Sequence, residues 1–315
     1  NFSTRILRIL PSVQLFSVRG FLSKLPIPDT IVGQVSAPKD VKKLEPETEA
    51  KCVSVYRYDP DACEDPYMQE YEIEPQDIGL KVLDILFFIK NNIDPTLVFR
   101  RSCREGICGA CAMNINGINR LACLTQTPKG PITIYPLPHM YVIKDLVVDL
   151  KQFYRQYREI EPWLQRCDEE ELLAKKQQLL QSIRDRDKID GCFECILCAC
   201  CSTSCPSYWW HGGSMKDDFL GPAALLQAYR WIIDSRDHKH CERLQKLNHK
   251  FKLYRCHTIM NCVKACPKAL NPGRAIALLK LMLTEQMKKD VPDMDNPPAD
   301  EPKKPPGQEA KKVEA

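Results

Sequence analysis

The feature that most constrains this chain is a run of cysteines that ends at a proline. Four thiols follow the spacing C-x2-C-x2-C-x3-C-P, at Cys195, Cys198, Cys201 and Cys205 before Pro206. This spacing is typical of thiolates that ligate iron–sulfur clusters, where the first three bind one cluster and the fourth binds a neighbouring one. Buried or disulfide-bonded cysteines are one alternative, and a zinc site is another, because C-x2-C pairs also bind zinc. The run therefore predicts a fold built around paired metal sites.

A second run repeats the same frame with one substitution. Positions 256, 259, 262 and 266 stand at the same intervals and are followed by Pro267, but the second position is Ile259 instead of cysteine. An apolar side chain offers no substitute ligand and helps to exclude water. A structural zinc site needs four ligands, so a three-thiol site fits the zinc alternative poorly.

Exchange of the fourth cysteine between the two runs gives two ligand sets. The set predicted for a 4Fe–4S cluster has four thiols: Cys195, Cys198, Cys201 and Cys266. The other set has only three: Cys205, Cys256 and Cys262. Three thiolates cannot hold all four irons of a cubane, so the corner under Ile259 should be vacant. We therefore expect a 3Fe–4S cluster there.

A third group of cysteines lies earlier in the chain. Its spacing is C-x4-C-x2-C with a more distant fourth thiol, as in plant-type 2Fe–2S ferredoxins: Cys103, Cys108, Cys111 and Cys123. Gly106 and Gly109 should allow the backbone to curl around the cluster with unusual φ values and to bring N–H groups close to sulfur. The alternative is a set of structural cysteines in a β-domain.

Six further cysteines remain, and we expect all of them to be non-ligands, mostly small buried apolar side chains: Cys52, Cys63, Cys167, Cys192, Cys200 and Cys241. Cys192 could in principle exchange with its neighbour Cys195. The total of 17 cysteines is odd, and the cysteines cluster tightly. These two features favour metal ligation in a reducing compartment over a disulfide scaffold.

Length and charge restrict the remaining possibilities. A chain of 315 residues should hold about two domains, and its net charge of +4 gives no sign of a nucleic-acid partner. No stretch approaches eighteen consecutive apolar residues, so we expect no membrane span. Residues 1–28 are Arg-rich and contain no acidic residue, as in a mitochondrial transit peptide, although an ordinary basic arm is the alternative. Residues 29–50 are interpreted as a linker, and residues 289–315 as a Pro- and charge-rich tail that should be disordered or loosely docked.

Between these ends the hydrophobic pattern changes once. Residues 51–144 predict strands near Val53 and Tyr71, a helix over 82–89, a strand over 97–99, a hairpin over 112–122 turning at Asn116-Gly117, and a strand over 132–135. Residues 145–288 have helical spacing from Lys144 onward, a possible capping box at Asp168 and Glu171, and helix starts at Pro222 and Pro272. The predicted class is α+β. A β-grasp plant-type 2Fe–2S ferredoxin domain comes first, and an all-α bacterial-ferredoxin-like domain follows.

The three motifs together resemble those of a known family. The stretches Cys103–Cys111, Cys205–Trp210 and Tyr254–Cys262 resemble the iron–sulfur subunit of succinate dehydrogenase, respiratory complex II, and its mitochondrial members most closely. The likeness covers roughly residues 50–288. It implies a subunit of a succinate:quinone oxidoreductase that lies on the matrix side of the mitochondrial inner membrane as a peripheral protein. It also implies that succinate is oxidised on a separate FAD-containing flavoprotein subunit, so this chain would hold no residue for succinate chemistry.

The same resemblance implies an electron path and a quinone site. Electrons would pass through 2Fe–2S, 4Fe–4S and 3Fe–4S clusters to ubiquinone, at the junction with hydrophobic membrane-anchor subunits. The implied quinone pocket has six residues: Pro206, Ser207, Trp209, Trp210, His257 and Ile259. Residue chemistry supports part of it, because the two tryptophans carry N–H donors beside Cys205 and His257 could relay a proton. The alternative is that these side chains are ordinary core aromatics and a satisfied core histidine.

Three other functions stay open at the level of sequence. The iron–sulfur subunit of a quinol:fumarate reductase shares these modules, and the direction of electron flow depends on a flavoprotein that the chain does not contain. A soluble multi-cluster ferredoxin is a second alternative, although such carriers are usually smaller. A zinc-binding interaction module is the third, and iron and sulfide analysis distinguishes it from the others.

Overall fold

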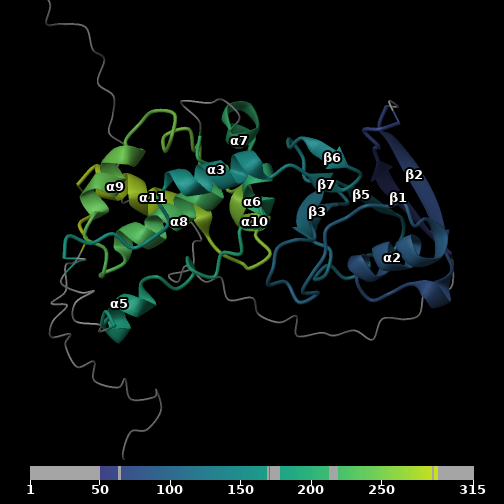
Figure 1. Cartoon of the computed structure of the whole chain (residues 1–315), viewed down its shortest axis with the longest axis horizontal. Coiled ribbons are helices and arrows are strands. Elements are labelled where there is room, and N and C mark those ends of the chain that lie inside the picture. Colours follow the sequence, from purple (N-terminus) through teal and green to yellow (C-terminus); the bar gives the residue numbers. More distant parts are fainter. Residues whose placement is uncertain are drawn as a thin grey trace, which may run out of the picture.

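The computed structural model describes residues 50–62, 65–168, 170, 178–212, 219–285 and 287–289. In Figure 1 the strands lie at one end of the molecule, and the helices α3, α8, α9 and α11 lie at the other. The predictions for residues 1–28, for most of the linker, for the cap residue Glu171 and for the tail beyond Lys289 fall outside the described residues.

The first part of the chain forms a mixed sheet of five strands in the order β2-β1-β5-β3-β4. The strands are β1 (Lys51–Arg57), β2 (Tyr67–Ile73), β3 (Ala112–Ile115), β4 (Ile118–Leu121) and β5 (Ile132–Tyr135). Strands β1 and β5 are parallel, whereas the pairs β1–β2, β3–β4 and β3–β5 are antiparallel. Helix α2 (Val82–Phe88) covers the sheet, with the short turns η1 (Pro75–Asp77) before it and η2 (Ile89–Ile93) after it.

Alternating burial explains how this sheet pairs with its helix. Every second residue of β1 is buried, and Val53 and Val55 are fully enclosed. They share one apolar cluster with Val82, Ile85 and other residues of α2. A strand with one buried face gives this alternation, because successive side chains point to opposite faces.

The hairpin between β3 and β4 turns as predicted. Asn116 has a φ of 49° and Gly117 a φ of 80°. Positive φ at both central residues defines the type I′ turn that an Asn-Gly pair favours. The hairpin therefore places Cys111 just before β3 and Cys123 just after β4, at the same end of the two strands.

Two predictions in this region are wrong, and one buried carboxylate explains both. Residues 97–99 form no strand, because Val98 gives its N–H to the Oδ2 atom of Asp145 at 2.8 Å instead of to a neighbouring strand. The helix expected from Lys144 begins only at Lys151, since Asp145 has a φ of 45° and the chain first forms the small hairpin β6 (Val142–Lys144) and β7 (Val147–Val148). Asp145 is buried and also accepts a 3.0 Å bond from Nε of Arg57.

The remainder of the described chain is helical, so the α+β class holds: a mixed sheet is followed by helices. The helices are α3 (Lys151–Glu159), α5 (Ile183–Asp187), α6 (Cys200–Thr203), α7 (Pro206–His211), α8 (Gly221–Ile233), α9 (His240–Leu247), α10 (Asn261–Lys264) and α11 (Pro272–Leu283). Within the described ranges, none of them is long and apolar enough to cross a membrane.

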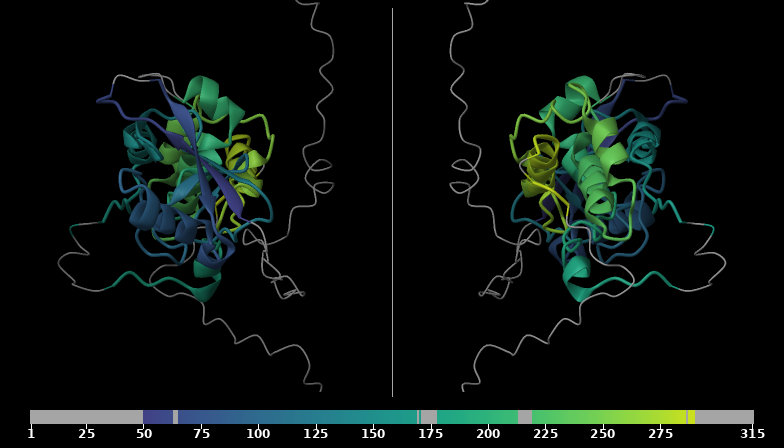
Figure 2. Two further views of the ribbon diagram at one scale, coloured as in Figure 1. Left: turned by 90° about the vertical axis from the view of Figure 1, so that its right-hand side faces the viewer. Right: turned by 90° about the vertical axis from the view of Figure 1, so that its left-hand side faces the viewer.

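Helices α8 and α11 lie side by side and form the centre of the helical core, as the right-hand view of Figure 2 shows. Both start as the sequence predicts. Pro222 lies in the first turn of α8, and the side chain of Asn271 accepts a 2.8 Å bond from the N–H of Arg274 at the start of α11. Helix α11 ends at Leu283.

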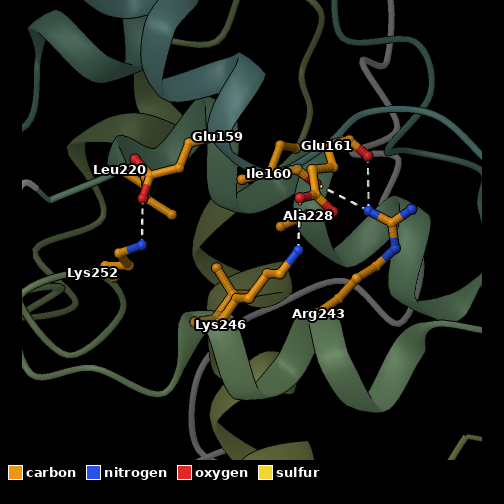
Figure 3. A pocket seen from close by; sticks show the side chains of 9 residues that line it. Glu159, Ile160, Glu161, Leu220, Ala228, Arg243, Lys246 and Lys252 are labelled. Atoms are coloured by element: carbon orange, nitrogen blue, oxygen red, sulfur yellow. Dashed lines mark hydrogen bonds and ion pairs between the residues drawn. The ribbon is translucent and has the colours of Figure 1, made fainter.

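Ion pairs connect the end of α3 with α9 and with the turn that follows α9. Figure 3 shows a pocket in which the Nζ atom of Lys246 lies 2.6 Å from a carboxylate oxygen of Glu161, and Lys252 pairs with Glu159. Arg243 donates to the carbonyls of Ile160 and Glu161 at 3.0 and 2.8 Å, which satisfies backbone oxygens at the helix end. Because these charges are matched within the pocket, it serves the packing of the two helices.

Candidate iron–sulfur centres

The loop that we call site 1 holds Cys103, Cys108, Cys111 and Cys123, and its backbone is folded around sulfur. The N–H groups of Glu105, Ile107 and Cys108 point at Sγ of Cys103 over 3.3–3.4 Å. These three donors hold the pKa of Cys103 at about 6, because hydrogen bonds favour the thiolate. Such N–H···S contacts are also one of the means by which proteins set the reduction potential of iron–sulfur clusters.

The two glycines of this loop adopt the backbone predicted for them. Gly106 and Gly109 have φ values of 74° and 72°. Gly109 also makes a close approach, since an added Cβ there would lie 3.0 Å from Cβ of Cys198 and 3.2 Å from the carbonyl oxygen of Ile196. The loop of site 1 therefore touches the cysteine run of the helical domain.

The second half of site 1 is more enclosed. Cys111 and Cys123 are buried, and the N–H of Cys123 reaches Sγ of Cys111 at 3.4 Å. Burial raises the pKa of the Cys111 thiol to about 12, although the N–H bond opposes the shift. Site 1 thus has a side that is open to solvent, where Cys108 is exposed and Cys103 half-buried, and a buried side against the sheet.

A cavity that we call site 2 collects thiols from both runs. It is lined by Cys195, Cys198, Cys201 and Cys266, and its other walls are mainly apolar residues that include Ala223, Leu226 and Leu270. It contains about 340 Å³ of space, counting its mouth. Burial raises the pKa of Cys195 to about 11 and raises that of Cys201 more strongly. The structure therefore brings together the four thiols that the spacing of the two cysteine runs predicts to share one cluster.

A neighbouring cavity, site 3, collects the other three thiols. Cys205, Cys256 and Cys262 line it, with apolar walls that include Phe219 and Ile276. Its space is about 380 Å³, counting its mouth. Burial raises the pKa of Cys262 to about 12, and the nearby Cys256 and Cys205 add to the shift.

The backbone of the two runs has the same shape. Leu197 and Ala199 flank Cys198 with φ values of 53° and 65°, and Thr258 and Met260 flank Ile259 with φ values of 60° and 68°. Alternation of this kind turns successive N–H groups toward one point and forms a concavity suited to anions and iron–sulfur groups. Ile259 thus occupies in its loop the place that Cys198 occupies in the first one.

The donor set and its surroundings suit iron–sulfur clusters. The thiols of sites 2 and 3 line hollows whose other walls are mainly apolar. In the part of the chain that the structure describes, no group of three or more His, Cys, Asp or Glu side chains is arranged around a single metal ion. Thiolates are the usual protein ligands of iron–sulfur clusters, so the residues present fit such groups.

The six residues of the predicted quinone pocket do not all meet. Pro206, His257 and Ile259 line site 3 together, and Ile259 is 50% exposed at its mouth. Ser207 is buried in α7 and lies outside this lining. The lining adds Thr258, Met260 and Asn261, which the sequence reasoning missed although they lie within the second run.

The two tryptophans lie on α7 and are arranged differently from the prediction. The indole N–H of Trp209 donates to the carbonyl of Thr203 at 2.6 Å, so this donor is already used within the protein. Its ring stacks on His139, with ring centroids 4.3 Å apart, and no sequence motif indicated that residue. Trp210 is 71% exposed and lies edge-on to Trp209.

The cysteines expected to be non-ligands divide into two groups. Cys192 and Cys200 are buried, and Cys192 lies outside the lining of site 2. Cys167 and Cys241 are exposed, so the expectation of buried side chains is wrong for them. Cys167 lies in a surface loop and Cys241 in the first turn of α9, where no apolar layer covers them. Cys52 is half-buried, and Cys63 lies outside the described residues.

Comparisons with known proteins agree with this organisation. Residues 52–155 match the family described as 2Fe-2S iron-sulfur cluster binding domain, and residues 194–271 match the family described as 4Fe-4S dicluster domain. A chain of the Mycobacterium smegmatis Sdh1 complex is similar in structure, with a TM-score of 0.63 and 25% identity over 76% of this chain and 98% of that one. A hypothetical protein from Helicobacter pylori gives a TM-score of 0.43 and 16% identity over 75% of this chain and 40% of that one, which is too remote to bear on the argument.

These matches bear out the resemblance at the level of the subunit type, and mitochondrial origin stays a prediction. In domain content the chain has a 2Fe–2S cluster-binding domain followed by a 4Fe–4S dicluster domain, and in architecture it resembles a chain of the Sdh1 complex.

Proposed function

We propose that this chain carries electrons within a succinate:quinone oxidoreductase, from an FAD-containing flavoprotein subunit to ubiquinone. The observation that carries the proposal is the grouping of the thiols. Each of the cavities at sites 2 and 3 takes cysteines from both runs, and the second run has Ile259 at the place of a fourth ligand. Two adjacent clusters suit a series of one-electron transfer steps.

The proposed ligands follow from these groups. The 2Fe–2S ligands are Cys103, Cys108, Cys111 and Cys123; the 4Fe–4S ligands are Cys195, Cys198, Cys201 and Cys266; the 3Fe–4S ligands are Cys205, Cys256 and Cys262. When bound, such clusters supply one-electron oxidation and reduction.

The protein's own contribution is insulation, alignment and control of charge. Apolar walls keep water from sites 2 and 3, which strengthens every electrostatic interaction inside them. Backbone N–H groups aimed at Cys103 stabilise negative charge at site 1. The contact of Gly109 with Cys198 joins sites 1 and 2 through packed atoms, which supports electron transfer between these two sites.

We place the quinone at the mouth of site 3. His257 and Ile259 lie there with Pro206, beside the three thiols. His257 is the candidate for delivering a proton to a quinone oxygen, because imidazole changes protonation near neutral pH. Trp209 contributes its ring face and not its N–H, since that group is bonded to Thr203. Trp210 contributes an exposed amphipathic ring that suits a membrane–water boundary.

The partners and location follow from the same proposal. The exposed side of site 1, at Cys103 and Cys108, is the natural entry for electrons from the flavoprotein. Site 3 and Trp210 are the natural contacts for hydrophobic membrane-anchor subunits. We place the assembled chain on the matrix side of the mitochondrial inner membrane, as a peripheral subunit.

The decisive experiment combines iron and sulfide analysis with EPR of the purified complex. We expect a 3Fe–4S signal in the oxidised protein and a 2Fe–2S signal after reduction. Two 4Fe–4S clusters without a 3Fe–4S signal would contradict the assignment of site 3, and zinc without sulfide would contradict the whole proposal.

Substitution at Ile259 sharpens this test. Ile259→Cys should permit a fourth iron at site 3, remove the 3Fe–4S signal, lower the potential and slow quinone reduction. Thr258→Cys is the matched control, because it adds the same thiol one residue out of frame and should leave the 3Fe–4S signal in place. Identical EPR spectra in wild type and Ile259→Cys would refute the vacant corner.

A further inference from the structure

One buried asparagine joins the sheet domain to the cysteine run of the helical domain. Asn119 lies on β4 and is only 3% exposed. Its Nδ2 group donates to Oγ1 of Thr203 at 2.9 Å and to Oγ of Ser204 at 2.8 Å. These partners are more than eighty positions away in the chain, at the end of α6.

The other hydrogen bonds of Thr203 and Ser204 determine which group donates and which accepts in their contact with Asn119. The Thr203 hydroxyl donates to the carbonyl of Ala199 at 2.8 Å, and the Ser204 hydroxyl donates to the carbonyl of Cys200 at 2.8 Å. Each hydroxyl has one hydrogen, so each can only accept from Asn119. The two hydrogens on Nδ2 of Asn119 are therefore donated to the oxygens of two hydroxyl groups whose own hydrogens are already bonded to backbone carbonyls.

The other end of the same amide is held within the hairpin. Oδ1 of Asn119 accepts a 2.8 Å bond from Nδ2 of Asn114, its cross-strand neighbour on β3. This bond places the amide oxygen toward the strand and the amide nitrogen toward α6. The network thus gives Asn119 one orientation.

The hydrogen bonds from Asn119 to Thr203 and Ser204, which we call the bridge, connect the hairpin next to site 1 with the helix next to sites 2 and 3. The hairpin that carries Asn119 has Cys111 just before its first strand and Cys123 just after its second, and both belong to site 1. Helix α6 follows Cys198 of site 2 and leads to Cys205 of site 3. A second close approach between the domains is Gly109 against Cys198. Apolar residues of the two domains also pack together, among them Leu137 with Cys200 and Ala223, so the bonds of Asn119 add direction to a contact that apolar packing alone would leave less defined.

We propose that Asn119 is a positioning residue that sets the separation of site 1 from sites 2 and 3 by holding α6 against the β3–β4 hairpin. This inference rests on the proposed electron-transfer function. Asn119 touches no proposed ligand side chain, so it acts through the backbone of α6. Its loss should change the coupling between clusters and leave the cluster types unchanged.

The test uses the assembled complex and two matched variants. Asn119→Leu removes the bridge and the bond to Asn114, whereas Asn114→Leu removes only the bond within the hairpin. The readout is the low-temperature microwave power saturation of the reduced 2Fe–2S signal. Neighbouring paramagnetic clusters accelerate its relaxation, and that effect falls steeply with separation.

We expect the 2Fe–2S signal to saturate at lower power in Asn119→Leu than in wild type, with iron and sulfide contents equal, and to remain as in wild type in Asn114→Leu. Equal saturation in all three proteins would overturn the inference, as would equal changes in both variants. Loss of clusters from sites 2 and 3 alone in Asn119→Leu would support it, because α6 carries Cys201 of site 2 and leads to Cys205 of site 3. Loss of the 2Fe–2S cluster as well would overturn it.

A second variant keeps the test valid if the leucine protein does not fold. Asn119→Ala forces no bulk between the hairpin and α6, and it has no polar group that could donate to or accept from the two hydroxyls. It should show the same easier saturation, and wild-type saturation would count against the bridge. Failure of the proposed function is distinguishable, because wild-type protein would then lack the 2Fe–2S signal altogether.

Discussion

Gly109 gives the most direct energetic test of how the two domains meet. In Gly109→Ala the new Cβ would lie 3.0 Å from Cβ and 3.1 Å from Cα of Cys198. Both atoms are held by the backbone of the cysteine run, so neither can rotate away. The residue would also keep a φ of 72°, which disfavours any residue with a Cβ.

The two effects have separable magnitudes. Left-handed backbone costs an alanine about 1–2 kcal/mol. Forcing a methyl group into a packed contact costs about 1–3 kcal/mol more. Gly117 supplies the matched control, because its φ is 80° and an added Cβ there meets nothing within 4 Å. Gly117→Ala should therefore show only the backbone cost, and the two variants should differ by about 1–3 kcal/mol.

The assay is urea unfolding of the cluster-loaded protein, followed by the visible absorbance of the clusters and by far-UV circular dichroism. Gly109→Ala should unfold at clearly lower urea than Gly117→Ala, and its clusters should be lost before its secondary structure. Equal midpoints for the two variants would show that Gly109 is needed only for its φ, and would refute the close approach to Cys198.

Three further predictions concern other parts of the molecule. His257→Ala should slow quinone reduction on the order of 10²-fold, as loss of a proton donor does, with all EPR signals intact; normal turnover would remove His257 from the mechanism. For Asp94, burial raises the pKa, but bonds from Thr96 and other neighbours outweigh it and hold the pKa at about 2. This carboxylate therefore adds stability that is complete above about pH 5 and is lost as the pH falls toward 2; solvent screening of this partly exposed group reduces the contribution to about 1 kcal/mol. Thermal melts between pH 5 and 2 should show a weaker acid dependence in Asp94→Asn, and parallel curves would contradict this. Cys192→Ala should keep the full iron content, whereas Cys195→Ala should lose iron from site 2; iron loss in both would make Cys192 a ligand.

Local patterns in the sequence were sufficient for several elements of the fold. The Asn116-Gly117 pair predicts the hairpin because only a few residue types tolerate positive φ twice in succession. Alternation around Val53 predicts β1, and Asn271 with Pro272 predicts the start of α11. Each of these signals acts within a few residues of the structure that it determines.

The errors arose where a distant side chain controls the backbone. Residues 97–99 have the composition of a strand, yet Asp145 takes the N–H of Val98 from forty-seven positions away. The same carboxylate binds Arg57, eighty-eight positions away, and ends the helical pattern before Lys151. Nothing near Asp145 in the sequence indicates either partner.

The candidate site also combines features that local sequence predicts with features that depend on distant residues. The grouping of thiols follows from ligand spacing, which is a local rule applied twice, and the cavities contain those groups. The use of the Trp209 N–H by Thr203, and the stacking of His139 on that ring, depend on how α7 folds back on α6. The exposure of Cys167 and Cys241 likewise depends on which surfaces the helices leave uncovered.

The interleaving of the two cysteine runs has a consequence for biogenesis. With the proposed ligands, site 2 needs Cys266 and site 3 needs Cys205, so neither run can complete a site alone. Seventy-one positions separate Cys195 from Cys266, so insertion of both clusters must wait until the two runs have come together. The ligands of site 1 all lie between Cys103 and Cys123 and have no such requirement. A chain whose two runs have not yet met would hold the complete ligand set of site 1 and a row of open thiols, and would need protection from oxidation until its helical part folds.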